Sequence, residues 1–391
     1  MKKYIHRQIE SSLLQASKEF PSLVLTGARQ TGKTTLLKKI FPEYRYVTFD
    51  DPIQRKIAID DPLFFLEQLG RKAIIDEVQY VPQILSYIKM DIDKNRSQNG
   101  KFILTGSQVF PLMSGLTESL AGRVALFELF GISFPEFHNL EKISREETYK
   151  YILKGFYPDS LIHKVNHIHY YRSYLQTYLE RDIRQVTSVH DLKLFQDFLE
   201  LLAARVGSLL NLNEVSKECG VSFTTAKRWL SLLETTNIVY LLRPYHKNIS
   251  KRIVKSPKLY FTDTGLLSYL LHCQSEKNLI YNPLAGSFFE NLVVIELLKY
   301  KYNNNGIFEL YFYRDSHNNE IDIVIEYGNV VQLFEVKSAT TIRLEHIKTI
   351  QNYIDIFHNA RGFLLTFYEE EQKITKSITA IPWYKIYEKL K

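Results

Sequence analysis

A loop with a glycine at each end lies between a short apolar run and a helical run, and this order allows few folds. Residues 23–26 predict a buried strand, and residues 27–34 follow with the pattern G-x-x-x-x-G-K-T. Glycines let such a loop curl until successive backbone N–H groups point inward and bind phosphate oxygens. Strand, loop and helix together predict a P-loop in an α/β sheet.

A P-loop of this kind predicts ATP and Mg²⁺ as ligands. Lys33 would reach the β- and γ-phosphates, and the Thr34 hydroxyl would ligate Mg²⁺. The positive end of the helix dipole adds to the attraction for phosphate. The predicted nucleotide-binding residues are Gly27, Ala28, Arg29, Gln30, Thr31, Gly32, Lys33, Thr34 and Thr35.

A second apolar run, residues 73–75, ends in the carboxylates Asp76 and Glu77. In a parallel sheet, ligands bind at the carboxyl ends of the strands. Asp76 is therefore expected to hold Mg²⁺ through water, and Glu77 to orient the water that attacks the γ-phosphate.

A third apolar run leads into Thr105, Gly106 and Ser107. Its polar end is expected to lie between the γ-phosphate and Glu77, where Ser107 would sense hydrolysis; the alternative is an ordinary strand-to-loop turn. Arg123 follows a turn containing glycine and is a candidate arginine finger. It can act within its own chain or on a neighbouring one, and the alternative is a surface arginine.

These motifs, with residues 134–137, 178–183 and 260–267, resemble the AAA-type ATPases of bacteria and archaea that carry a C-terminal domain of unknown function. The resemblance covers nearly the whole chain. It implies the fold and ATP binding, and it implies no particular biological role.

The middle of the chain predicts a helix-turn-helix. Residues 212–219 predict a short helix, and Ser222 is the expected N-cap of a second helix that runs to about Thr235. The apolar positions that follow helical spacing on the second helix are Ala226, Leu230 and Leu233. Such a helix can enter a DNA groove. Five positive charges then follow without an acid between them, at Lys247, Lys251, Arg252, Lys255 and Lys258. A winged helix that contacts DNA phosphates is one interpretation, and a protein-contact surface is the other.

The C-terminal third predicts a β-hairpin with acids on one face. If Gly328 and Asn329 form a two-residue turn, Tyr327 pairs with Val330. Asp322 then lies opposite Glu335, and Glu320 opposite Lys337, all on one face. That face is expected to be exposed. The opposite face carries Ile321, Ile323 and Ile325 against Gln332, Phe334 and Val336, and is expected to be buried.

The order Asp, then Glu-x-Lys, resembles that of restriction-endonuclease-like phosphodiesterases. The resemblance implies that Asp322 and Glu335 hold Mg²⁺ and that Lys337 steadies the attacking water or the phosphate charge. It also implies an upstream helical acid, for which Glu290 is the candidate. The alternatives are a solvated sheet face with a Glu320–Lys337 salt bridge, and a nuclease fold that has lost its activity.

We therefore expect a multidomain α/β protein with an AAA-type ATPase domain at 1–138, a helical connector at 139–205, a winged helix at 206–275 and an endonuclease-like domain at 276–391. The expected function is an ATPase that acts on double-stranded DNA. The alternative is an ATP-dependent regulatory or scaffolding protein that binds other proteins or itself and carries an inactive nuclease fold.

Composition favours a cytoplasmic protein without membrane contact. No apolar stretch approaches the roughly 18–20 residues of a membrane span, and the first residues show no signal-peptide pattern. Cys219 and Cys273 have no metal-ligand spacing and form no disulfide framework. The net charge of +7 allows contact with nucleic acid without requiring it.

Overall fold

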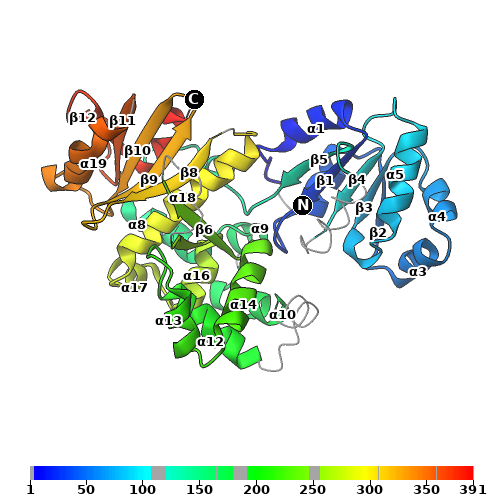
Figure 1. Ribbon diagram of the computed structural model, residues 1–391, viewed down its shortest axis with the longest axis horizontal. Coiled ribbons are helices and arrows are strands. Elements are labelled where there is room, and N and C mark those ends of the chain that lie inside the picture. The colour runs from blue at the N-terminus through cyan, green and yellow to red at the C-terminus, as the bar shows by residue number, and fades with distance from the viewer. Residues whose placement is uncertain are drawn as a thin grey trace. The chain divides into compact units, whose positions relative to one another are not determined.

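The computed structural model describes residues 4–106, 120–163, 165–178, 192–245, 256–306, 308–357 and 359–390. They form two compact units (Figure 1). The first holds Met1–Ile132 with two short returns, Thr235–Asn237 and Tyr302–Asn305. The second holds Ser133–Glu234, Ile238–Lys301 and Gly306–Lys391. Apart from the returns, the three domains expected after residue 138 thus lie in one compact unit.

The first unit is a parallel sheet covered on both faces. Its strands run in the order β2-β3-β4-β1-β5, and each neighbouring pair is parallel. The strands are β1 (Ser22–Thr26), β2 (Arg45–Thr48), β3 (Ala73–Asp76), β4 (Phe102–Thr105) and β5 (Val124–Glu128). The helical segments are α1 (Glu10–Glu19), α2 (Lys33–Ile40), α3 (Pro52–Asp60), α4 (Pro62–Leu69), η1 (Val78–Tyr80) and α5 (Ile84–Lys94).

Two buried clusters explain why the strands read as unbroken apolar runs. Val24 packs on one face of the sheet with Ile84 and Ile88 of α5. Leu23 and Leu25 pack on the other face with residues of α1 and α2. A strand buried on both faces needs apolar side chains at every position. Strands β1, β3 and β4 end in polar residues, so Thr26, Asp76 and Thr105 lie at one edge of the parallel sheet.

The second unit begins with helices. They are α7 (Phe134–Phe137), α8 (Arg145–Lys154), α9 (Pro158–Ile162), α10 (His167–Tyr178), α12 (Leu192–Ala203), α13 (Leu212–Glu218), α14 (Phe223–Thr235), α16 (Thr264–Leu270) and α17 (Glu276–Ile280). The predicted helix pair is present as α13 and α14, and the Ser222 hydroxyl accepts a hydrogen bond from the Thr225 N–H at 3.1 Å. Ala226, Leu230 and Leu233 are buried, as expected.

The remainder of the second unit is a mixed sheet of eight strands, in the order β12-β13-β11-β10-β9-β8-β6-β7. The strands are β6 (Val239–Pro244), β7 (Lys258–Phe261), β8 (Glu309–Arg314), β9 (Glu320–Tyr327), β10 (Val330–Val336), β11 (Ala360–Thr366), β12 (Gln372–Lys373) and β13 (Ile378–Pro382). The helical segments are α18 (Ala285–Asn303), η3 (Leu344–Ile347), α19 (Lys348–Tyr353), η4 (Ile354–Ile356) and η5 (Trp383–Lys389). The hairpin β6–β7 joins this sheet through β8, where Arg243 and Pro244 pair with Tyr311 and Phe312.

The hairpin β9–β10 has the predicted register, from Tyr327 opposite Val330 to Ile323 opposite Phe334. The prediction that its acidic face is exposed is wrong. Asp322 and Glu335 are 8% and 7% exposed.

Side chains from η3 and α19 bury the acidic face. Ile347 and Ile350 pack in one cluster with Val324 and Leu333, which lie on that face. Ile323, on the opposite face, is also buried. Both faces of the hairpin are therefore buried.

Candidate functional site

The P-loop follows β1 and has the backbone that its glycines allow. Gly27 and Gly32 have φ values of +138° and +93°, in the region that favours glycine. A Cβ at Gly27 would lie 2.2 Å from the carbonyl oxygen of Leu129, so no larger residue fits there. The buried Lys33 ammonium donates to the carbonyl oxygens of Gly27 and Ala28 at 2.8 and 2.9 Å.

Thr34 and Asp76, the two predicted Mg²⁺-binding residues, lie side by side. The Thr34 hydroxyl donates to Asp76 Oδ2 at 2.7 Å, and the Tyr46 hydroxyl donates to the same oxygen at 2.8 Å. Burial, reinforced by the Asp76 charge, raises the pKa of Tyr46, so Tyr46 stays a donor. A hydroxyl beside a carboxylate suits Mg²⁺, which prefers oxygen ligands.

Glu77 follows Asp76 in a left-handed conformation with φ +54°. Such a conformation is uncommon for a residue with a side chain and marks a position worth a functional explanation. The Gln79 side-chain amide donates to Glu77 Oε2. Strand β4 lies between β1 and β3, so Thr105 ends between the P-loop and Glu77, as expected. The buried Thr105 hydroxyl has no hydrogen-bond partner among the described residues.

Two other predicted residues are not part of this arrangement. Ser107 lies outside the described residues. Arg123 precedes β5 at the amino edge of the sheet, where its carbonyl accepts from Ser22. That edge is separated from the P-loop by the length of β1, about 13 Å. The Arg123 guanidinium forms a bidentate pair with Asp93 at 2.8 and 3.0 Å. The expectation of an arginine finger at this chain's own P-loop is therefore corrected.

Sequence reasoning missed two residues of the site. Arg7 is buried and donates to the carbonyl oxygens of Thr31 and Phe130 at 3.0 and 2.8 Å, which ties the N-terminal segment to the P-loop. Tyr46 reaches Asp76 because β2 pairs with β3. Neither contact has a local sequence signal, since each depends on pairing between distant segments.

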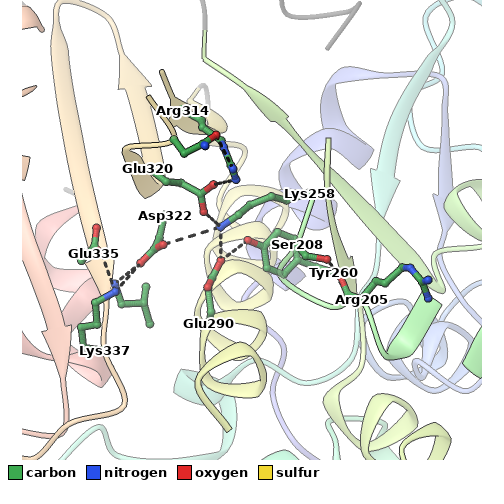
Figure 2. A network of polar contacts seen from close by, with 12 residues as sticks. Arg205, Ser208, Lys258, Tyr260, Glu290, Arg314, Glu320, Asp322, Glu335 and Lys337 are labelled. Carbon is green, nitrogen blue, oxygen red and sulfur yellow. Dashed lines mark hydrogen bonds and ion pairs between the residues drawn. The ribbon is translucent and has the colours of Figure 1, made fainter. Parts of the chain in front are cut away.

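The second unit gathers acids and lysines in one buried cluster (Figure 2). Lys337 Nζ lies 2.7 Å from Glu335 Oε1 and 3.9 Å from Asp322 Oδ2. Lys258 Nζ lies 2.6 Å from Glu320 Oε1, 2.9 Å from Glu290 Oε1 and 3.9 Å from Asp322 Oδ1. The predicted set Glu290, Asp322, Glu335 and Lys337 therefore does converge, from helix α18 and from the hairpin.

The observed location of Lys258 differs from the predicted one. It was expected on an exposed basic wing, but its side chain is 2% exposed. It begins β7 and takes part in the eight-stranded sheet, so its ammonium points at the acids. The other predicted wing charges, Lys247, Lys251, Arg252 and Lys255, lie outside the described residues. The alternative Glu320–Lys337 bridge is absent from the pairs of the described residues, where Glu320 pairs with Lys258 and Arg314.

The electrostatics of the cluster reflect burial of like charges. Burial, and then the neighbouring Asp322, raise the pKa of Glu335 to about 8. Burial raises the pKa of Glu290 as well, against the effect of Lys258. Burial works to lower the pKa of Lys337, but Asp322 and Glu335 outweigh it and raise that pKa overall. Burial also works to lower the pKa of Lys258, but Tyr260 and the neighbouring acids outweigh it, so both lysines stay charged.

The fit of this cluster to a metal ion is partial. Among the described residues, no group of three or more His, Cys, Asp or Glu side chains is arranged to hold one. Glu335 Oε2, however, is buried and has no hydrogen-bond partner among the described residues. An unsatisfied carboxylate oxygen beside Asp322 is the feature that a single divalent cation would satisfy.

The sheet and P-loop define the class, the P-loop nucleotide-binding proteins. Residues 19–138 match the family model described as an AAA domain. Residues 145–277 and 285–386 match two domains of unknown function, DUF8612 and DUF4143. The protein is thus an ATP-binding protein of the AAA type. No helix among the described residues is long and apolar enough to cross a membrane.

Two mycobacterial proteins are similar over most of the chain. The uncharacterized proteins Rv2008c of Mycobacterium tuberculosis and Mb2031c of Mycobacterium bovis are each 30% identical over 339 residues, which is 86% of this chain and 74% of theirs. The chain belongs to the family of these two proteins.

Similar solved structures are more distant. The Walker-type ATPase PABY2304 of Pyrococcus abyssi is 16% identical, with a TM-score of 0.44 over 68% of this chain and 96% of that one. The RuvB Holliday junction branch migration motor of Thermotoga maritima is 16% identical, with a TM-score of 0.31 over 60% of this chain and 89% of that one.

Proposed function

We propose that this protein is an ATP-hydrolysing switch whose second unit acts on DNA through a metal-dependent, nuclease-like site. The observation that carries the proposal is the convergence of Asp322, Glu335 and Lys337 in one buried cluster of the second unit. Two neighbouring carboxylates repel each other, and a chain that only needed a stable sheet would gain from apolar residues there.

The ATPase half of the proposal assigns a role to each group at the P-loop. The backbone of residues 27–35 would cradle the phosphates, and Lys33 would bind the β- and γ-phosphates. Mg²⁺, when bound to Thr34 and Asp76, would neutralise phosphate charge. Glu77 would orient the attacking water, and Thr105 would contact the γ-phosphate side of the site. Arg123 would act only on a neighbouring copy.

Contact with double-stranded DNA is proposed for the exposed side of α14. Its Lys227 and Arg228 are exposed, while the opposite side of the helix is packed in the core. A helix with one packed side and two exposed cations can lie against a groove and meet phosphates.

The nuclease-like half assigns Asp322 and Glu335 as the ligands of one divalent cation. The cation would supply charge stabilisation at a scissile phosphate. Lys337, next to both acids, would hold the attacking water or the developing phosphate charge. Glu290 is left out of the ligand set, because Lys258 and the Tyr260 hydroxyl both bind its Oε1, at 2.9 and 2.5 Å.

A second function is favoured by a different observation. The lysines already neutralise much of the acidic cluster, as expected of a nuclease fold that no longer cleaves. In that case the protein would be an ATP-dependent regulatory or scaffolding protein, and α14 would contact another protein.

A plasmid-nicking assay separates the two functions. The full chain is incubated with supercoiled plasmid, ATP and Mg²⁺ or Mn²⁺, beside Lys337→Ala and the control Lys376→Ala, which removes an exposed lysine. We expect nicking by the wild type and the control and none by Lys337→Ala. Absence of nicking by a folded wild type that hydrolyses ATP would favour the scaffolding function.

A further inference from the structure

Lys258 lies where three acidic side chains from two different elements meet. Its ammonium is within 2.6–3.9 Å of Glu320, Glu290 and Asp322, which come from β9 and α18 (Figure 2). The side chain of Lys258 is 2% exposed, so its ammonium is a positive charge held inside the fold among these acids.

The cluster divides into two lobes that share Asp322. The first lobe is Glu290, Glu320 and Asp322 Oδ1 around Lys258. The second lobe is Glu335 and Asp322 Oδ2 beside Lys337. In the first lobe, the acid oxygens nearest the centre all face one buried ammonium. In the second, Glu335 Oε2 has no partner among the described residues, and the Lys337 side chain is 38% exposed.

A lysine ammonium is a compact point charge and can take the place of a metal ion among carboxylates. We propose that Lys258 is the resident cation of the first lobe, so that the cluster binds at most one divalent ion, in the second lobe. The ion of the second lobe rests on the proposed nuclease-like function. The assignment of Lys258 does not, because it depends only on the contacts of the first lobe.

The substitution Lys258→Met keeps most of the side-chain volume and removes the charge. Three acids then face one another without the central cation, although Arg314 stays 3.0 Å from Glu320, Lys337 stays 3.9 Å from Asp322 and the Tyr260 hydroxyl still donates to Glu290. A divalent ion should occupy that position. We therefore expect the variant to bind one more Mn²⁺ than the wild type, and Mn²⁺ to raise its melting temperature more than that of the wild type.

The measurement is the number of Mn²⁺ ions bound per full-length chain, by calorimetry and by electron paramagnetic resonance without nucleotide. Any ion at the P-loop contributes equally to every variant. Lys101→Met is the matched control, since among the described residues this partly buried lysine forms its ion pair with one acid, Asp91, at 2.5 Å. One carboxylate alone does not form a metal site when the lysine charge is removed, so this variant should gain no ion.

Equal ion counts in the wild type and Lys258→Met would overturn the proposal. If that variant does not fold, Glu290→Gln decides, because it keeps Lys258 beside Glu320. An unchanged count supports the proposal, and a loss of one ion shows that Glu290 is a metal ligand and contradicts it. The second lobe is tested separately by Glu335→Gln. If this variant binds as many Mn²⁺ ions as the wild type, the proposed metal site of the second lobe is wrong. The comparison of Lys258→Met with the wild type is still valid in that case.

Discussion

At the scale of single residues, the contacts of Lys33 hold its ammonium inside the curve of the P-loop. From there the ammonium would meet the β- and γ-phosphates. We predict that Lys33→Ala abolishes measurable ATP affinity in calorimetry without unfolding the protein. Lys39→Ala, which removes an exposed lysine from the same helix, should bind ATP like the wild type. Unchanged affinity in folded Lys33→Ala would contradict the assignment.

Glu77 separates nucleotide binding from hydrolysis. Its uncommon φ of +54° and its hydrogen bond from Gln79 fix a carboxylate just after the strand that carries Asp76. Glu77→Gln keeps the shape and removes the charge, so ATP should still bind while phosphate release falls about ten-fold or more. Glu67→Gln, at an exposed position on α4, is the control. Turnover within about twofold of the wild type would mean that another residue orients the water.

Glu335 gives the protein a pH-dependent stability. Its pKa is raised from 4.5 to about 8, mainly by burial and then by Asp322. Between these values the folded chain holds a proton that the unfolded chain has lost. Stability therefore falls as pH rises through this window, by at most about 1.4 kcal/mol per pH unit from this group.

The substitution Glu335→Gln should make that dependence shallower. Urea denaturation of the metal-free chain at pH 5 and pH 7.5 measures it. We expect the variant to lose less stability than the wild type between the two pH values. An equally steep loss in both proteins would show that Glu335 is not protonated in the folded state.

At the scale of elements, α14 is the candidate DNA-binding helix. Replacing both Lys227 and Arg228 by alanine should weaken binding to duplex DNA. It should also reduce the salt dependence of log K by about two, one for each phosphate contact. Lys277→Ala, which removes an exposed lysine from α17, should change neither the affinity for DNA nor its salt dependence. An unchanged salt slope in the double variant would favour the protein-contact interpretation of this helix.

Local sequence patterns predict several of these elements but not the burial of the acidic residues. The apolar runs of β1, β3 and β4, the helix pair α13–α14 and the hairpin register follow from local patterns, because period and turn chemistry decide them. The burial of Asp322 and Glu335 could not be predicted. It depends on η3 and α19, whose Ile347 and Ile350 pack on the hairpin from a later part of the chain.

At the scale of the whole molecule, long-range pairing limits what can be inferred from sequence. The expected boundary at residues 275 and 276 falls inside the span of one sheet, because β6 pairs with β8 across it. That pairing also explains Lys258. A run of basic residues is typical of a solvated wing, but the first residue of β7 belongs to the sheet and meets acids from β9 and α18. No local pattern contains that information.

We propose that ATP bound in the first unit drives DNA cleavage by the second. The most direct test is the rate of plasmid nicking with Mg²⁺, measured with and without ATP for the wild type, Lys33→Ala and Lys337→Ala. We predict that the wild type nicks at least ten times faster with ATP, that Lys33→Ala loses this acceleration, and that Lys337→Ala does not cleave under either condition. Nicking that is independent of ATP would contradict the coupling of the two units, and nicking that persists in Lys337→Ala would contradict the role of Lys337.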